Sequence, residues 1–257
     1  MYTVLGELVL PAGGSAWTGS LVEALAALGV NERNARQALV RLRDDGLLVV
    51  EREGRRARQR LSPRGQALLE AGARRIYEFG CGPGTWSGEW LLVHCSVPEA
   101  QRAVRHRLQR GLGFEGFGFV AAGLAVSPHP ERAPAVTALL KELGLAGDAL
   151  VLRARTAGGA ADAELVARAW DIDALGERYR AFGARFGRAV AAGDAEAFTH
   201  TVRLVHAWRR FPFADPELPV ELLPADWAGA AARAAFARQH AAWAHGARAW
   251  FERLDAR

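Results

Sequence analysis

The chain has 257 residues, of which 50% are hydrophobic and 24% charged, so it is long and apolar enough for two or three folded domains. Its formal net charge is +5, and Lys141 is its only lysine beside 32 arginines. Two cysteines, Cys81 and Cys95, are too few for a disulfide framework or a cysteine-based zinc site.

The positive charge is concentrated near the beginning of the chain. Residues 1–75 contain 12 arginines and 8 acidic residues, a net charge of +4, whereas residues 76–257 contain 21 basic and 20 acidic side chains, a net charge of +1. The general excess of Ala, Gly and Arg suggests a GC-rich coding bias, so the location of the arginines is more informative than their number. This location predicts that a polyanion binds within residues 1–75.

Nothing in the sequence indicates a membrane protein. Every apolar stretch is well short of the roughly 20 residues that span a bilayer. Residues 1–14 lack the basic segment that precedes the apolar part of a signal peptide. We therefore expect a cytoplasmic protein without a membrane partner.

The beginning of the chain, residues 1–30, has the pattern of two helices and a short strand. Apolar residues at helical spacing predict a helix over residues 2–10, and residues 16–18 suit a strand. Ser20 and Glu23 have the spacing of a capping box for a second helix that ends at Gly29. The turn at residues 29–31 has the length expected in a helix-turn-helix.

The third predicted helix carries the polar residues that suit base recognition. Asn31 is its expected N-cap, and its buried face contains Ala35, Ala38, Leu39 and Leu42. Amide side chains pair well with adenine, and arginine pairs well with guanine. We expect DNA contacts from the residues that lie largely off the apolar face, namely Arg33, Asn34, Arg36, Gln37 and Arg41.

A basic β-hairpin is predicted directly after this helix. Gly46 suits the helix end, and strands over residues 47–52 and 55–61 are joined by a tight turn at Glu53-Gly54. Five arginines fall between Arg52 and Arg60, and their mutual repulsion is relieved by a polyanion or by acidic partners. A solvated face would explain the helix alone, but helix and hairpin together predict a winged helix-turn-helix. We expect phosphate contacts from Arg55, Arg56, Arg58 and Arg60.

The middle of the chain predicts a second domain. Ser62-Pro63 begins a helix that runs to about Phe79, and glycines and a proline at residues 80–84 indicate a domain boundary. Strands over residues 90–97, 114–120, 123–126 and 150–155 alternate with helices that begin at Pro98 and at Glu131. The order β-α-β-β-α-β is that of a ferredoxin-like unit, whose open sheet face suits self-association.

The last third of the chain is predicted to be helical. A Gly/Ala linker at residues 156–161 precedes helices over 164–170, 172–191, 194–210 and 228–254, with Asp226 as the expected cap of the last one. A proline-rich bridge at residues 211–219 interrupts them. We therefore expect an α+β protein with a winged helix-turn-helix at 1–79, a ferredoxin-like dimerisation domain at 85–156 and a helical effector or dimerisation domain at 162–257.

Taken together, the segments resemble the PaaX family of transcriptional repressors of phenylacetic-acid catabolism. The resemblance spans nearly the full length, and its last motif is specific because its Pro, Asp and Trp residues are unusual in a generic helical sequence. The segments that carry it are LGELVLPAGGSAWTGSLVEALAALGVNERNARQALVRL, GRRARQRLSPRGQALLEAGARRIY, WSGEWLLV, AWDIDALGERY and RRFPFADPELPVELLPADW.

The resemblance implies a homodimer that binds double-stranded operator DNA and leaves it when an aryl-CoA thioester, such as phenylacetyl-CoA, binds. It also implies a central domain similar to the small ferredoxin-like nucleases of CRISPR adaptation. Those nucleases carry a carboxylate near the end of their first strand, and residues 90–97 contain no acidic residue. Metal-assisted cleavage of DNA therefore lacks its ligand here.

An acyl-CoA effector requires cations for its phosphates and an apolar slot for its acyl group. The last domain offers both kinds of residue, although the same residues would equally suit helix faces packed on the central sheet. The candidate effector residues are Trp170, Arg178, Tyr179, Arg180, Arg203, Trp208, Arg209, Arg210 and Phe211.

An enzymatic function has little support. The pairs His200/His206 and His240/His245 lack the i, i+4 spacing of a helical metal site, and the glycine pattern at residues 111–116 follows a predicted helix rather than a strand. We predict no catalytic residues, no metal and no cofactor. A regulator of another small-molecule effector, an activator, and a nuclease-related ferredoxin-like protein are the alternatives.

Overall fold

The computed structural model of the protein describes residues 1–80, 85–157 and 161–257. Cys81, the rest of the predicted break at 82–84 and residues 158–160 of the predicted linker lie outside this part of the chain. The chain is a mixture of helices and antiparallel sheets that divides into two compact units. Unit 1 comprises Met1–Phe79, Ala181–Arg210 and Ala230–Arg257, and unit 2 comprises Gly80–Arg180 and Phe211–Gly229.

Unit 1 begins with the predicted helices. The first is partly π-helical, because the short α-helix α1 continues directly into the wider turns of η1. The predicted helices are confirmed, and their bounds are α1 Tyr2–Val4, η1 Leu5–Val9, α2 Thr18–Ala27, α3 Glu32–Asp44 and α4 Pro63–Tyr77.

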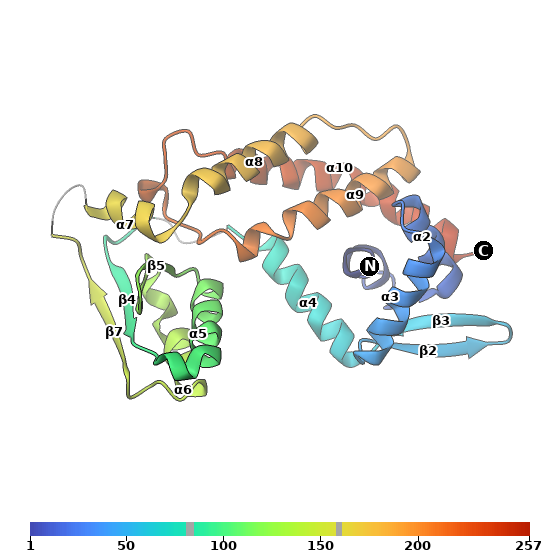
Figure 1. The fold of residues 1–257 in the computed structure, drawn as a ribbon. Coiled ribbons are helices and arrows are strands. Elements are labelled where there is room, and N and C mark those ends of the chain that lie inside the picture. The colour runs from blue at the N-terminus through green and yellow to red at the C-terminus, as the bar shows by residue number, and fades with distance from the viewer. Residues whose placement is uncertain (81–84, 158–160) are drawn as a thin grey trace. The chain divides into compact units, whose positions relative to one another are not determined.

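A three-stranded antiparallel sheet in the order β1-β3-β2 accompanies these helices, and Figure 1 shows its β2–β3 hairpin. The hairpin register pairs Glu53 with Arg56, so the two-residue turn is Gly54-Arg55 and not the predicted Glu53-Gly54. Gly54 adopts φ +61°, and a positive φ at the first turn position is the conformation that suits the twist of a two-residue hairpin. The strands are β1 Ser15–Trp17, β2 Leu48–Glu53 and β3 Arg56–Leu61.

The core of unit 1 combines both ends of the chain. The helices α9 (Asp194–Trp208) and α10 (Gly229–Asp255) place Phe198 and Phe251 among the buried leucines that lie between Leu5 and Leu61. Figure 1 shows the red end of α10 beside α2 and the hairpin. Phe198 is fully buried and Phe251 is 2% exposed, so the packing of the first three helices depends on side chains from the far end of the sequence.

The same long-range packing overturns the predicted capping box. Helix α2 begins at Thr18, and its N-cap is Trp17, whose side chain makes no capping bond. Ser20 is buried inside the helix, and its hydroxyl donates to the carbonyl of Leu254 at 3.4 Å. The prediction failed because a tertiary partner, rather than the first turn of the helix, satisfies this hydroxyl.

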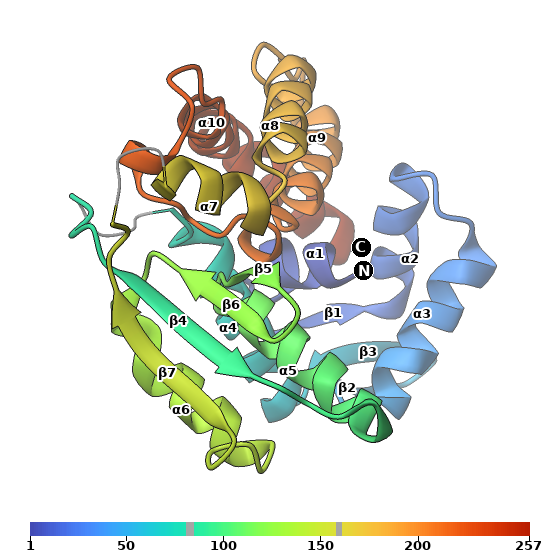
Figure 2. The same ribbon diagram turned by 60° about the vertical axis from the view of Figure 1, so that its left-hand side comes forward.

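Unit 2 contains a four-stranded antiparallel sheet in the order β5-β6-β4-β7 (Figure 2). The predicted strand at residues 114–120 is shorter than expected, because Phe114 is the last residue of α5. The strands are β4 Trp90–Cys95, β5 Gly118–Ala121, β6 Leu124–Ser127 and β7 Ala149–Ala154. The element order β-α-β-β-α-β is the predicted one.

Helices α5 (Arg102–Phe114) and α6 (Ala133–Glu142) cover one face of this sheet. Short 3₁₀ turns at Glu99–Gln101 and Pro130–Arg132 lead into them. Leu91, Val93 and Cys95 point to this face, because alternate residues of a strand share a face. The other face carries Trp90, which packs against α7 and the segment Phe211–Gly229.

The predicted C-terminal helices are also present. Asp226 is not the cap of the last helix, because α10 begins only at Gly229. The division between the two units falls within α8. The remaining elements are α7 Ala161–Ala169, α8 Ile172–Phe186, η4 Phe211–Phe213 and η5 Val220–Leu222.

Candidate DNA-binding site

Helix α3 presents its predicted polar residues to solvent. Asn31 caps it by accepting a hydrogen bond from the backbone amide of Asn34 at 2.8 Å. Ala35, Leu39 and Leu42 are buried, as predicted, whereas Ala38 is only partly buried. The opposite side of the helix is exposed and carries all five predicted DNA contacts, Arg33, Asn34, Arg36, Gln37 and Arg41.

One residue of this face has a local partner. Arg36 pairs with Glu32 one turn earlier, with Nε 2.8 Å from the carboxylate. Both side chains are more than half exposed, so the pair contributes only a few tenths of a kcal/mol to helix stability and is easily exchanged for another acceptor.

The four predicted arginines of the hairpin fall into two groups. Arg55 lies in the turn and Arg56 begins β3, and both are exposed. Arg58 and Arg60 lie further along β3 and have acidic partners within the protein. Arg60 donates twice to the Glu51 carboxylate, at 2.6 and 2.9 Å, across the β2–β3 ladder. This guanidinium holds the pKa of Glu51 below its ordinary value.

Arg58 is held by the other end of the chain. Its Nη2 donates to Asp255 at 3.3 Å, and the other oxygen of Asp255 accepts the backbone amide of Trp17 at 2.8 Å. Asp255 is the last residue of α10. One carboxylate therefore joins the end of α10 to β1 and β3.

Trp17 provides a flat surface for two of these arginines. The guanidinium carbons of Arg56 and Arg58 lie 4.0 and 4.8 Å from the centre of its indole ring. A cation over an aromatic face loses less conformational freedom when it binds a phosphate, because its side chain is already partly ordered. The sequence gives no local signal for Asp255, because its partner Trp17 lies near the opposite end of the chain.

The nine candidate effector residues lie in both units. Trp170, Arg178, Tyr179, Arg180 and Phe211 belong to unit 2, whereas Arg203, Trp208, Arg209 and Arg210 belong to unit 1. Two of the unit 2 candidates, Tyr179 and Phe211, are buried in its core. Tyr179 and Phe211 stack with their ring centres 4.1 Å apart, and the Tyr179 hydroxyl donates to Asp215.

The remaining candidates differ in how accessible they are. Trp208 is only 1% exposed and stacks on Phe236, with the ring centres 4.8 Å apart. Arg178, Arg180, Arg203 and Arg210 are exposed, and Arg180 pairs with Glu177 at 3.0 Å. A ligand could reach these arginines directly, but it could reach Trp208 only after the core of unit 1 opens.

The described residues contain neither a candidate metal cluster nor a membrane-spanning helix. No group of three or more His, Cys, Asp and Glu side chains there is arranged to hold a metal ion. None of the helices within this part of the chain is both long enough and apolar enough to cross a bilayer. Strand β4 ends without a carboxylate, since its residues are Trp90–Cys95.

Comparisons with known proteins agree along the chain. Three family models match it, described as PaaX-like protein over residues 1–65, PaaX protein central Cas2-like domain over 83–166 and PaaX-like protein C-terminal domain over 170–253. The transcriptional repressor PaaX of Escherichia coli K12 is 34% identical over 242 residues, which cover 90% of this chain and 75% of that protein.

A solved structure has the same fold. An uncharacterized protein from Mycobacterium tuberculosis superposes with a TM-score of 0.65 over 96% of each chain, at 25% sequence identity. The Cas2-like description of residues 83–166 agrees with the resemblance expected for the central domain. The chain therefore belongs to the PaaX family, and the curated relative that it matches is a transcriptional repressor.

Proposed function

We propose that this protein is a transcriptional repressor that binds double-stranded operator DNA through a winged helix-turn-helix formed by α2, α3 and the β2–β3 hairpin. The observation that carries the proposal is the exposed face of α3. All five predicted DNA contacts of this helix lie on that face, opposite the buried residues. A helix with this arrangement fits the major groove, where base edges differ in their hydrogen-bonding groups.

The two groups of residues have different tasks in this proposal. Asn34 and Gln37 are suited to pair with adenine, and the arginines of α3 with guanine. Arg55 and Arg56 at the tip of the hairpin contact phosphates, which position the protein without reading sequence. Arg58 and Arg60 contribute less than their number suggests, because Asp255 and Glu51 already neutralise them.

We further propose a three-domain homodimer with a ferredoxin-like central domain. Strand β7 is an edge of the four-stranded sheet, and its Leu150 and Leu152 are 58% and 52% exposed. An exposed apolar edge strand is costly for a monomer, so burial against a second copy supports the dimer. A two-fold dimer would bind an inverted repeat with half-sites about one or two helical turns apart.

The family resemblance supports the next part of the proposal, which concerns the regulated genes and the effector. Under this proposal the cytoplasmic repressor controls a phenylacetate-type catabolic operon and is released by an aryl-CoA thioester such as phenylacetyl-CoA. The exposed Arg178 and Arg180 of unit 2 and, separately, the exposed Arg203 and Arg210 of unit 1 are candidates to bind CoA phosphates. Tyr179 and Phe211 are buried in unit 2 and Trp208 is buried in unit 1, so each would have to move to contact an acyl group, which makes them weaker candidates than the arginines.

Binding to a duplex selected from random sequence tests the DNA proposal. Affinity should fall steeply with salt because phosphate contacts release counterions. Replacing Arg55 and Arg56 together by Ala should lower the log–log salt slope by about 1.8 for each protomer and the affinity by roughly 30-fold for each protomer at about 0.15 M salt, if each arginine contacts one phosphate. The matched control, Arg185→Ala with Arg188→Ala, removes the same charge from an exposed part of unit 1 and should change neither quantity much.

Base recognition requires a separate variant. Gln37→Ala should reduce discrimination against single-base changes in the selected site by about 1–3 kcal/mol at one base pair, while the salt slope stays the same. A weak salt dependence in the wild type, or unchanged behaviour of both hairpin and helix variants, would refute the DNA-binding assignment.

The effector proposal is tested by release of the bound duplex. Phenylacetyl-CoA should release DNA, whereas free CoA should not, because only the thioester carries the acyl group. Release by a different aryl-CoA alone would retain the mechanism and change the effector. No release by any aryl-CoA would refute acyl-CoA control.

A further inference from the structure

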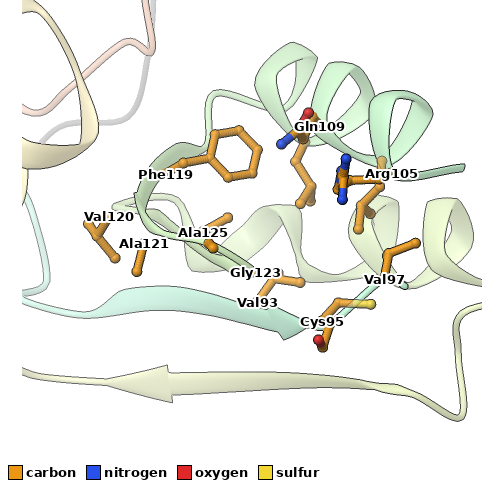
Figure 3. Close-up of a pocket in the computed structure, with 14 residues that line it drawn as sticks. Val93, Cys95, Val97, Arg105, Gln109, Phe119, Val120, Ala121, Gly123 and Ala125 are labelled. Carbon is orange, nitrogen blue, oxygen red and sulfur yellow. The ribbon is translucent and has the colours of Figure 1, made fainter. Parts of the chain in front are cut away.

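A cavity lies inside unit 2, between the helix-covered face of the sheet and α5. Its volume is about 420 Å³, which is within the range of small-molecule sites. Figure 3 shows Arg105 and Gln109 reaching toward it from α5, with Val93 and Cys95 on β4 and Phe119 on β5. The cavity is separate from the proposed DNA-binding residues and from the nine candidate effector residues.

The β5–β6 turn keeps one side of this cavity open. The turn residues Ala122 and Gly123 are exposed, as is Ala121 at the end of β5, so no large side chain covers the space behind them. The ladder is irregular between Phe119 and Ala121, which indicates a bulge at the cavity edge. Such irregularities often occur where a strand borders a functional site.

Backbone contacts fix the position of this turn. The amide of Cys95 donates to the carbonyl of Gly123 at 2.8 Å. Gly123 adopts φ +75°, and a Cβ atom at this position would lie 2.9 Å from the carbonyl oxygen of Cys95. The opening is therefore part of the backbone arrangement of the sheet.

The lining of the cavity combines an apolar floor with one cation. Of the fourteen lining residues, Arg105 alone is charged, and none is acidic. Burial raises the pKa of the Cys95 thiol, which keeps this group neutral. Ser96 and Gln109 add polar groups, and the floor is formed by Val93, Cys95, Leu108, Leu112, Phe119 and Ala125.

Arg105 retains most of its hydrogen-bonding capacity. Its Nη1 donates to Glu99 at 2.6 Å, and the Glu99 side chain is 76% exposed and lies outside the lining. A guanidinium has five N–H donors, so this pair leaves other donors for a second acceptor. The arginine can bind a carboxylate in the cavity without giving up Glu99.

We propose that this cavity binds a small hydrophobic monocarboxylate, with its aryl or alkyl group on the apolar floor and its carboxylate on Arg105. A complete acyl-CoA does not match this chemistry. In an acyl-CoA the carboxylate has been converted to an uncharged thioester. The phosphates of CoA lie far from the acyl group, at the other end of the pantetheine arm.

Direct binding to the full-length protein, without DNA, tests the proposal. We would titrate 3-phenylpropionate, and the neutral 3-phenylpropionamide as its uncharged analogue, by isothermal calorimetry. The acid should bind saturably and at least tenfold more tightly than the amide. Because no DNA is present, failure here leaves the repressor proposal untouched, and failure of the repressor proposal leaves this site untouched.

Four variants locate the ligand. Arg105→Gln should weaken the acid about tenfold and remove the preference over the amide. Gln109→Trp should abolish binding, because an indole from this exposed helix position fills the cavity. Glu99→Gln should tighten binding a few-fold by freeing Arg105. The control Arg102→Gln removes one charge from an exposed position of α5 outside the lining and should bind like the wild type.

Protection of Cys95 gives an independent measurement. In a Cys81→Ser background, saturating 3-phenylpropionate should slow alkylation of Cys95 several-fold, and Arg105→Gln should remove this protection at the same ligand concentration. Absence of binding, equal affinity for the acid and the amide, or binding that is unchanged in both Arg105→Gln and Gln109→Trp would overturn the proposal.

Discussion

Asp255→Asn tests whether the end of α10 holds the DNA-binding hairpin in place. In the wild type one carboxylate accepts the Trp17 amide at 2.8 Å and the Arg58 guanidinium at 3.3 Å. Asn retains one acceptor oxygen for Trp17 but loses the negative charge. Arg58 would then face a neutral amide, while its Nε is already buried and has no hydrogen-bond partner within the described residues.

The structure gives the size of this effect. Hydrogen bonds to charged groups contribute about 1.5–3 kcal/mol when they are buried. The side chains of Asp255 and Arg58 are 14% and 29% exposed, so solvent screens part of this energy. We expect a loss of about 1–2 kcal/mol in the local stability of β1 and β3.

Hydrogen–deuterium exchange measures this local loss, because the two units need not unfold together. Amides of residues 15–17 and 56–61 should exchange about 5- to 30-fold faster in Asp255→Asn. Asp194→Asn is the matched control, because it breaks a pair with Arg253, which lies on α10 like Asp255. The side chains of Asp194 and Arg253 are 43% and 58% exposed. The effect of this control should stay below about 0.5 kcal/mol. Equal exchange in the two variants would refute the role of Asp255.

Three further predictions follow from individual contacts. Gly65→Ala should destabilise unit 1 by more than about 2 kcal/mol in urea denaturation, because the new Cβ would lie 2.1 Å from the Leu47 carbonyl oxygen. Its control is Gly72→Ala in the same helix, where a Cβ meets nothing within 4 Å. This variant should stabilise unit 1 by about 0.5–1 kcal/mol. Burial, aided by nearby Arg132, lowers the pKa of His129 from 6.5, so below that pH the unfolded chain binds more protons than the folded one. The stability of unit 2 should therefore fall as the pH drops below about 6.5, and His129→Gln should make stability less dependent on pH in this range. Glu51→Gln should free Arg60 and raise DNA affinity a few-fold at low salt, with a salt slope steeper by about 1; an unchanged slope would mean that Arg60 does not contact phosphate.

The elements that the sequence predicts well depend on local chemistry. Asn31 caps α3 through an amide three residues away, Ser62 caps α4 in the same way at 3.0 Å, and Gly46 adopts φ +69° just after α3. These signals lie within a few residues of the structure they determine. The exposed residues of α3 follow from the same helical periodicity, and for this reason that part of the candidate site was predictable.

The features that the sequence did not predict depend on distant partners. The spacing of Ser20 and Glu23 matches a capping box, yet the carbonyl of Leu254 takes the Ser20 hydroxyl. The aromatic residues Tyr179 and Trp208 lie in two helices of the region expected to bind an effector, and both are buried. Spacing alone does not distinguish a ligand slot from a packed helix face, because both require apolar side chains on one side of a helix.

The charge of the hairpin shows why a count of arginines overstates the phosphate-binding surface. Five arginines lie between Arg52 and Arg60, and their mutual repulsion predicts a partner that relieves it. For Arg58 and Arg60 this partner is an acid of the same chain. The acid for Arg60 lies on the neighbouring strand, but the acid for Arg58 comes from the last residue of α10. The DNA-facing surface therefore depends on packing of the C-terminal helix as well as on the segment from Met1 to Phe79, and a change that shifts α10 within unit 1 would alter the position and the charge of the hairpin together.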